Sequence, residues 1–228
     1  LINKGTYGEV FKVEKKISNE IFALKKINIS KLPIYEREEI ITELKILFFH
    51  DCEYLLKGID LFTYYKNRNS YLCIITEFAE NIDLQTYVKN NTLSETEIWD
   101  VYEQLLIGLN YLHNYNIIHR DIKTTNILIK KNKKILIGDF GVSKILKNKY
   151  NFTNTIIGTP YFMSPELVKG SNYNKKADIW SLGCLLYEIV YNKVPFDAKN
   201  MYQLKRKIQW DNIYFHKCKY SDKLVNII

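Results

Sequence analysis

The side chains best suited to chemistry lie in two short strings, His-Arg-Asp-Ile-Lys-Thr-Thr-Asn at residues 119–126 and Asp-Phe-Gly at 139–141. Phosphoryl transfer requires a carboxylate that accepts a hydroxyl proton and hard oxygen ligands that hold Mg²⁺. Asp121 fits the role of base, and Lys123 can approach the transferred phosphoryl group. Asn126 and Asp139 fit the role of metal ligands. A chance cluster of polar residues would have to produce both strings in order, so the sequence predicts phosphoryl transfer.

A glycine-containing segment near the start of the chain is a candidate phosphate-binding loop. Residues 3–10 read Asn-Lys-Gly-Thr-Tyr-Gly-Glu-Val. Gly5 and Gly8 lack a Cβ, which lets backbone N–H groups approach phosphate oxygens. No Gly-Lys-Ser/Thr string opens a helix here, so the segment is not a Walker A loop. An ordinary glycine hairpin remains the alternative.

Two charged residues interrupt apolar patterns. Lys25 lies in an apolar strand 17 residues after Gly8, and Glu43 lies 18 residues further on in an amphipathic helix. Taken singly, each is most simply a side chain that faces solvent. As a pair, they would orient the Lys25 ammonium towards the phosphates of a nucleotide.

The elements that must position these residues change character along the chain. Apolar runs at 9–13, 21–25 and 71–76 predict strands, and a helical period predicts a helix over 36–49. From residue 94 onward the helical period dominates, with a second apolar helix over 177–190. We therefore expect an α+β protein in which a strand-rich small half is joined near residues 77–83 to a larger helical half.

The longest helical pattern follows Ser94. Ser94 and Glu97 have the spacing of a capping box, which marks the beginning of a helix. The helix is predicted to bury one wide apolar stripe, made of Ile98, Val101, Leu105, Ile107, Leu109 and Leu112.

Composition excludes several classes of protein. A chain of 228 residues that is 46% hydrophobic is neither disordered nor in need of disulfides to fold. Its 4 cysteines show no C-x-x-C spacing, which argues against a zinc ribbon and favours reduced thiols in an intracellular compartment. No apolar run approaches the ~20 residues that a membrane helix requires.

The net charge of +8 is unevenly distributed. Residues 1–80 carry 12 basic and 12 acidic groups, whereas residues 81–228 carry 21 basic and 13 acidic groups. Because 29 of the basic residues are Lys and only 4 are Arg, the surplus is weak evidence for a nucleic-acid-binding module. The basic half is compatible with acidic substrates or a phosphorylated loop, and a solvated lysine face is the alternative.

On these residues the chain resembles a eukaryotic protein kinase of the serine/threonine type over essentially its whole length. The family signatures match at Gly5-x-x-Gly8-x-Val10, at Ala23-Leu24-Lys25 and at both strings described first. Residues 158–166 and 173–184 are most similar to the NIMA-related (Nek) family. The resemblance implies a bilobal kinase-like fold over residues 1–228, with an N-lobe at 1–80 and a C-lobe at 81–228. It also implies that the closing C-terminal helices are missing.

The resemblance further implies a nucleotide site that takes ATP and Mg²⁺. Adenine would lie between Val10, Ala23 and Leu128, and backbone groups of Glu77 and Ala79 would hydrogen-bond it. Asp178 would brace the loop that carries Asp121. The implied catalytic residues are Asp121, Lys123, Lys25 and Glu43, and the implied metal ligands are Asn126 and Asp139. The implied nucleotide-binding residues are Asn3, Gly5, Gly8, Val10, Ala23, Lys25, Thr76 (the gatekeeper behind the adenine), Glu77, Ala79 and Leu128.

Regulation is implied by the 22-residue segment between Gly141 and Ser164. Thr155 matches the activating phosphothreonine position of Nek-like kinases, four residues before Thr159. A phosphate there would pair with Arg120 and with Lys144, and an unmodified loop is the alternative. The implied partners are protein substrates with Ser or Thr and either an upstream kinase or autophosphorylation. No specific nucleic acid and no membrane are implied, and the location is intracellular, cytoplasmic or cytoskeleton-associated.

Two departures from the family pattern carry expectations of their own. Asn3 stands where the first loop glycine is expected and adds a Cβ, which predicts weaker or slower nucleotide handling. Glu166 has no visible arginine partner, and if it were buried, that lack would be costly. A pseudokinase or scaffold that only binds is the alternative function. All five residues that phosphoryl transfer would use as catalytic groups or metal ligands are present, which favours the active enzyme: Lys25, Glu43, Asp121, Asn126 and Asp139.

Overall fold

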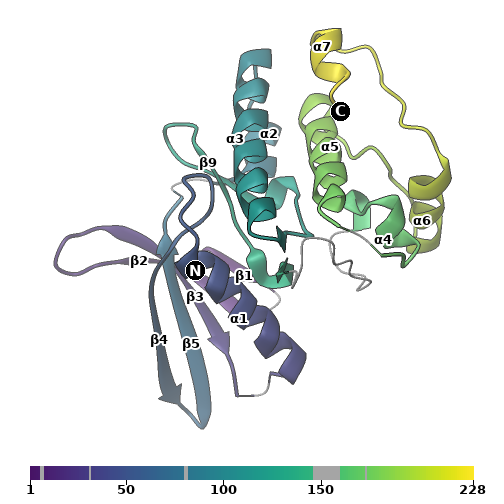
Figure 1. Cartoon of the computed structure of the whole chain (residues 1–228). Helices are drawn as coiled ribbons and strands as arrows, with labels where there is room; N and C mark the ends of the chain where they lie inside the picture. The colour runs from purple at the N-terminus through teal and green to yellow at the C-terminus, as the bar shows by residue number, and fades with distance from the viewer. Residues whose placement is uncertain (6–7, 31, 80–81, 146–159, 173) are drawn as a thin grey trace.

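The computed structural model describes residues 1–5, 8–30, 32–79, 82–145, 160–172 and 174–228. Its N-terminal part is an antiparallel sheet with one helix, and its C-terminal part is mainly helical (Figure 1). The N-terminus lies at the sheet and the C-terminus lies among the helices of the other part. The predicted α+β, bilobal fold class is confirmed.

The helices and strands follow one another in two groups. The N-terminal part contains β1 (Asn3–Gly5), β2 (Gly8–Glu14), β3 (Ile21–Asn28), α1 (Ile34–Phe49), β4 (Gly58–Lys66) and β5 (Asn69–Glu77). The C-terminal part contains β6 (Ile82–Asp83), α2 (Leu84–Asn90), α3 (Glu95–Asn114), β7 (Ile117–Ile118), η1 (Thr124–Asn126), β8 (Ile127–Ile129), β9 (Ile135–Ile137), η2 (Phe140–Val142), β10 (Lys144–Ile145), η3 (Pro160–Phe162), α4 (Pro165–Val168), α5 (Lys176–Tyr191), α6 (Met201–Trp210) and α7 (Asp222–Val225).

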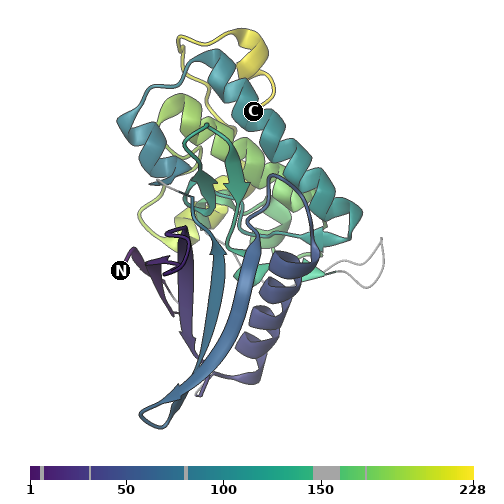
Figure 2. The same ribbon diagram turned by 90° about the vertical axis from the view of Figure 1, so that its left-hand side faces the viewer.

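The N-terminal sheet has the strand order β1-β2-β3-β5-β4. Its register sets Lys25 between Val10 and Ile74 and sets Ala23 opposite Thr76. Helix α1 lies along the sheet, as Figure 2 shows, and buries Ile46 with other apolar residues. The register and this packing bring residues from three strands and one helix together at one end of the sheet.

The sequence analysis located three of the five sheet strands individually. β2, β3 and β5 contain the predicted runs, and α1 begins at Ile34, directly after Pro33. β4 escaped prediction because it is an edge strand whose side chains are mostly exposed, so it carries little hydrophobic alternation. Gly58 at its start lets the strand pass under Phe48 of α1, since a Cβ there would lie 2.6 Å from the Phe48 ring.

The C-terminal part is built around α3 and α5, which contact each other. The predicted stripe of α3 is confirmed except at Ile107, which is 44% exposed. Ile107 is two residues from Leu105, about 200° around the helix, and therefore lies on the opposite face. Gly108 takes its place in the core, where the side chain of Ile137 occupies the space of the missing Cβ.

Two expectations about buried groups are settled by the structure. All four cysteines are free thiols, and burial raises the pKa of Cys184 to about 12, so it stays a neutral thiol. Glu166 is half-buried instead of buried, so its lack of an arginine partner is less costly than the sequence suggested. Among the described residues, no helix is long and apolar enough to span a membrane.

The predicted capping box at the beginning of α3 is confirmed. Ser94 N–H donates to Glu97 Oε2 at 2.8 Å, and Ser94 Oγ accepts from Glu97 N–H at 3.3 Å. Lys133 Nζ donates to Glu97 Oε1 at 2.6 Å. The hydrogen bonds from Lys133 and Ser94 lower the pKa of Glu97 to about 2. The ionised carboxylate is therefore favoured in the folded state.

Glu97→Gln removes the charge that Ser94 and Lys133 stabilise, so it should lower the free energy of unfolding at pH 7. The loss should be only about 1 kcal/mol, because the Lys133 side chain is largely exposed and solvent screens the ion pair. The depressed pKa stabilises the folded state above about pH 4.5, and this contribution is lost as the pH falls towards 2. Urea titrations at pH 7 and pH 3 measure the change. The exposed Glu103→Gln on the same helix is the control, and an equal effect of Glu97→Gln at both pH values would contradict the assignment.

Candidate functional site

A cavity of about 540 Å³ lies where the end of the sheet meets the C-terminal part. This volume is within the ordinary range for small-molecule sites. Eight of the residues expected to bind nucleotide line it: Gly8, Val10, Ala23, Lys25, Thr76, Glu77, Ala79 and Leu128. Glu43, Asn126 and Asp139 line it as well. Asn3 and Gly5 lie on β1, where they pair with Val10 and Gly8.

The sequence analysis missed part of the cavity wall, made of Ile2, Leu47, Leu56, Ile74, Phe78, Asp83, Thr125 and Gly138. Ile74 could have been found, because it is two residues from Thr76 on the same face of β5. Asp83 accepts from Thr86 N–H at 2.8 Å and so caps the beginning of α2. The beginning of this helix fixes the position of Asp83 in the cavity wall. Leu56 comes from the loop after α1, and no local pattern indicates its position.

Lys25 and Glu43 form an ion pair inside this cavity. Lys25 Nζ lies 2.6 Å from Glu43 Oε1, and the side chains are 22% and 6% exposed. Burial keeps solvent from screening the pair, and the charge-assisted hydrogen bond fixes the direction of the ammonium. The pairing across 18 residues that the sequence suggested therefore exists, and it joins the sheet to α1.

Glycine at position 8 is required by the sheet itself. A Cβ on Gly8 would overlap the carbonyl oxygen of Lys26 on the neighbouring strand β3. Any other residue would push β2 away from β3 at the point where the cavity wall begins. Sheet packing is thus one reason for this glycine, besides any approach to a phosphate.

The loop before η1 gathers the proposed catalytic side chains. Lys123 Nζ donates to Asp121 Oδ2 at 2.7 Å, and Asn126 Nδ2 donates to the same oxygen at 2.9 Å. Asn126 Nδ2 also donates to the backbone oxygen of Asp121 at 2.8 Å. The carboxylate is therefore held in one orientation, with the Lys123 ammonium as one of its donors.

Helix α5 holds this loop from beneath through a buried carboxylate. Asp178 is fully buried, and its two oxygens accept from the backbone N–H groups of His119 and Arg120 at 3.0 and 2.8 Å. His113 Nε2 lies 2.8 Å from the same carboxylate. The predicted bracing by Asp178 is confirmed. It supports Arg120 in a left-handed conformation, with φ of 70°, which is strained for a side chain with a Cβ.

A second carboxylate of α5 reaches the other end of the loop. Glu188 Oε2 accepts from the Thr124 hydroxyl at 2.6 Å, and Glu188 Oε1 accepts from Gln85 Nε2 at 2.9 Å. Thr124 and Glu188 are 64 residues apart in sequence, so no short motif predicts their contact. The sequence analysis did not identify Glu188.

The Asp139 segment connects the loop to α1. Asp139 has a left-handed backbone, with φ of 57°, and precedes the turn η2. Phe140 is fully buried and meets the His119 ring edge-on at a centroid distance of 5.4 Å, while α1 packs against η2. His119 Nε2 in turn lies 3.0 Å from the carbonyl oxygen of Gly138. This packing sets the Asp139 carboxylate at the cavity.

The donor set fits a magnesium ion. The Asn126 amide nitrogen is committed to Asp121, which leaves Asn126 Oδ1 as the atom for a cation, and Asp139 lines the same cavity. Mg²⁺ is usually held by one or two such oxygens together with substrate phosphates and water. Across the part of the chain that the structure describes, no cluster of three or more His, Cys, Asp or Glu has the arrangement of a metal site.

Two of the predicted regulatory residues cannot be placed. Thr155 and Thr159 lie outside the described residues. Arg120, the third, is buried, and one of its guanidinium nitrogens donates to the backbone oxygen of Ser143 at 3.3 Å.

Comparisons with known proteins agree with one another. The family model described as "Protein kinase domain" matches residues 1–226. The chain is 36% identical to the probable serine/threonine-protein kinase nek3 of Dictyostelium discoideum, over all of this chain and 21% of that protein. It is 35% identical to human serine/threonine-protein kinase Nek5, over 91% of this chain and 29% of that protein. It is 32% identical to mouse serine/threonine-protein kinase Nek2, over all of this chain and 53% of that protein. The chain thus spans between about a fifth and about half of these relatives.

Proposed function

The chain belongs to the protein kinase family and is similar to its Nek serine/threonine members, and on this premise we propose that it transfers the γ-phosphoryl group of ATP to Ser or Thr hydroxyls of proteins. The observation that carries the proposal is an oriented ammonium at Lys25 in the cavity wall together with a fixed carboxylate at Asp121, which accepts a hydrogen bond from Asn126 of the same wall. We assign residues 1–80 to the N-lobe and residues 81–228 to the C-lobe.

The nucleotide would enter the cavity with its adenine between Val10, Ala23 and Leu128. The Glu77 N–H already donates to the Lys57 carbonyl oxygen at 3.2 Å, so we assign the Glu77 carbonyl and the Ala79 N–H to the adenine edge. Thr76 and Ile74 line the same cavity, and we assign Thr76 to the position behind the adenine.

The reacting groups follow from the contacts of the loop. Asp121 accepts the proton of the attacking hydroxyl, and the hydrogen bonds from Lys123 and Asn126 hold its carboxylate in one orientation. Lys123 also supplies positive charge beside the transferred group. Lys25, held by Glu43, binds the phosphates that remain on the nucleotide. Magnesium bound by Asn126 and Asp139 would neutralise phosphate charge.

A scaffold that binds nucleotide without transferring phosphate is the alternative function. It would need the cavity but not the hydrogen bonds that hold the Asp121 carboxylate. The presence of those bonds, together with the buried Lys25–Glu43 pair, favours the enzyme.

The test is transfer of labelled γ-phosphate from ATP to casein by the purified chain. Transfer must disappear in Asp121→Asn and in Lys25→Met, since both remove a group that acts on the phosphates or the hydroxyl. Transfer that persists in both variants would come from a contaminating kinase, and binding of ATP without transfer by the parent chain would favour the scaffold.

Regulation by phosphorylation of Thr155 is part of the proposal, through an upstream kinase or autophosphorylation. A phosphate on Thr155 would add charge that Arg120 can pair with, next to Asp121. An intracellular site of action, cytoplasmic or at the cytoskeleton, is proposed from the same resemblance, with protein substrates as the partners.

Thr155→Ala should lower the rate of transfer at least about fivefold, the lower end of coupling between two sites, while ATP binding persists. Rates are compared after treatment with ATP and again after phosphatase. Thr153→Ala, two residues away, is the matched control and should behave as the parent. Equal rates of Thr155→Ala and the parent would remove Thr155 from the mechanism.

A further inference from the structure

Helix α6 exposes three residues of the types that dominate protein interfaces. Tyr202, Arg206 and Trp210 are spaced four residues apart and therefore share one face of the helix. Tyr202 is 78% exposed, Trp210 is 74% exposed, and Arg206 is exposed as well. Tyr, Arg and Trp are the residue types most enriched among the energetic centres of interfaces. A tryptophan exposed to this degree is not part of the core that the described residues form.

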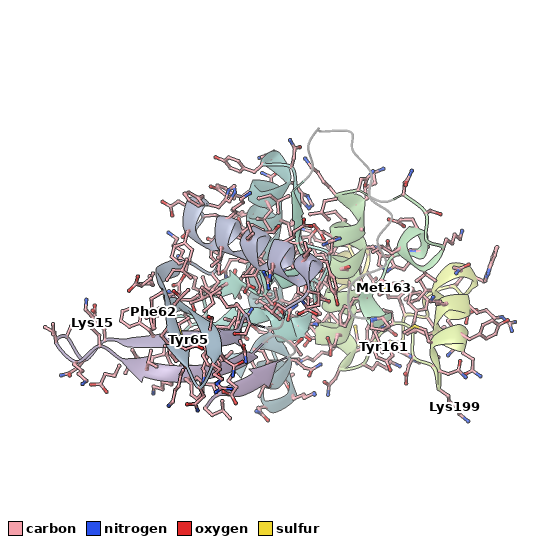
Figure 3. All side chains as sticks on the ribbon, turned by 90° about the horizontal axis from the view of Figure 1, so that it is seen from below. Lys15, Phe62, Tyr65, Tyr161, Met163 and Lys199 are labelled. Carbon is pink, nitrogen blue, oxygen red and sulfur yellow. The ribbon has the colours of Figure 1, made fainter. Side chains whose placement is uncertain are left out.

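The opposite face of α6 fixes the helix firmly. Leu204 and Ile208 are buried in an apolar cluster with Met163 and Leu167. α6 contacts α4 and η3, and Figure 3 shows Tyr161 and Met163 between the body of the C-terminal part and the helix. Lys207 Nζ donates to the backbone oxygen of Asp197 at 2.6 Å, which ties the helix to the preceding loop. The exposed face is thus a preformed surface that loses little freedom on binding.

The charge around this face selects an acidic partner. Residues 197–211 contain four basic residues, Lys199, Lys205, Arg206 and Lys207, against two acidic residues at the ends, Asp197 and Asp211, for a net charge of +2. None of the ion pairs between described residues involves Lys199, Lys205 or Arg206. Lys169 adds a cation at the end of α4, where its ammonium lies 5.6 Å from the centre of the Trp210 ring.

The position of α6 connects this surface to the reaction. η3 and α4, which α6 contacts, follow the segment that carries Thr155 and Thr159 in the sequence. In Figure 1, α6 lies beside α4 at the edge of the C-terminal part, away from the N-terminal sheet. A protein held on α6 would leave the nucleotide cavity open.

We propose that the Tyr202–Arg206–Trp210 face of α6 docks an acidic, apolar-containing segment of protein substrates, outside the segment that receives the phosphate. The proposal rests on the proposed kinase function. Carboxylates of the substrate pair with Arg206 and Lys205, and its apolar side chains pack on Tyr202 and Trp210. Docking raises the local concentration of substrate hydroxyls at Asp121, so it lowers KM for such substrates and leaves kcat unchanged.

Direct binding tests the surface without relying on catalysis. The probe is a labelled peptide of Glu, Asp and Leu, followed by fluorescence anisotropy, with a peptide carrying Lys in place of the acids as its control. Arg206→Glu and Trp210→Ala should each weaken binding of the acidic peptide about tenfold, as expected for removal of an interface centre. Arg206→Lys should retain most of the affinity. Lys16→Glu, an exposed charge reversal in the N-terminal part, is the matched control and should bind as the parent.

Kinetics then separate docking from the proposed function. With casein as the acidic substrate, Arg206→Glu should raise KM about tenfold with kcat unchanged, and turnover of a short neutral peptide should not change. Parent-like affinity and KM in both α6 variants overturn the docking proposal. Tighter binding of a single-stranded oligonucleotide than of the acidic peptide, lost in Arg206→Glu, also overturns it in favour of nucleic acid. If the parent binds the acidic peptide but transfers no phosphate, the kinase proposal fails while the surface remains.

Discussion

Asp121→Asn should lower the rate of phosphoryl transfer by about 10²- to 10⁴-fold, the usual contribution of a general base, while ATP binding stays near that of the parent. The substitution preserves the size and shape of the side chain but removes the charge that draws the hydroxyl proton. Lys123 and Asn126 both donate to one carboxylate oxygen, Oδ2, at 2.7 and 2.9 Å, and the amide oxygen of Asn can take the place of that acceptor. The loop therefore keeps its fold and loses its proton acceptor.

Lys25→Met should affect ATP binding as well as the rate, which distinguishes it from Asp121→Asn. Loss of the ammonium leaves the buried Glu43 carboxylate without its partner and removes a phosphate contact, so the apparent KM for ATP should rise as well as kcat fall. Titration calorimetry with ATP separates the two variants, and the exposed Asp100→Asn serves as a charge-matched control. A kcat for Asp121→Asn within threefold of the parent would assign the base to another group.

The site residues that could be predicted from the sequence are those that lie close together in one short motif. Asp121, Lys123 and Asn126 lie within six positions, so the loop that joins them cannot separate them far, and their hydrogen bonds follow from local geometry. For Lys25 and Glu43, the strand and helix patterns taken singly favoured side chains that face solvent, and only the expected ammonium–carboxylate pair across 18 residues brought them together. Lengths and faces of the long elements followed the same periods.

What escaped the sequence depends on contacts across the fold. Glu188 reaches Thr124 from a helix 64 residues away, and its spacing resembles that of any polar residue on a mostly buried helix. Arg120 has a left-handed backbone although it is not a glycine, because its N–H donates to the distant Asp178 carboxylate, which supports that conformation. β4 shows no alternation of apolar and polar residues, because it is an edge strand whose side chains are mostly exposed. In each case the decisive free energy comes from a partner that no local pattern identifies.

The support of the loop from α5 has the largest expected effect on stability. Asp178→Ala should lower the free energy of unfolding by about 3–5 kcal/mol, because it leaves two buried backbone N–H groups and His113 without their acceptor. For a chain of this length, that loss corresponds to a fall in Tm of about 6–20 °C. Asp178→Asn keeps one acceptor and the side-chain volume, so its loss should be smaller.

Catalysis should respond to Asp178 by a different route from stability. Asp178→Asn leaves one oxygen for the two backbone N–H groups and removes the charge, so the left-handed conformation of Arg120 loses support and should relax, moving the neighbouring Asp121 carboxylate. Asp178→Asn, which stays folded at 25 °C, should therefore show a reduced kcat with a nearly unchanged KM for ATP, because the nucleotide cavity is lined by other residues. Ile179→Ala, at the exposed neighbouring position of α5, controls for disturbance of the helix. Urea unfolding and initial rates give the two readouts, and a parent-like kcat in Asp178→Asn would mean that the loop keeps its geometry without the charge of α5.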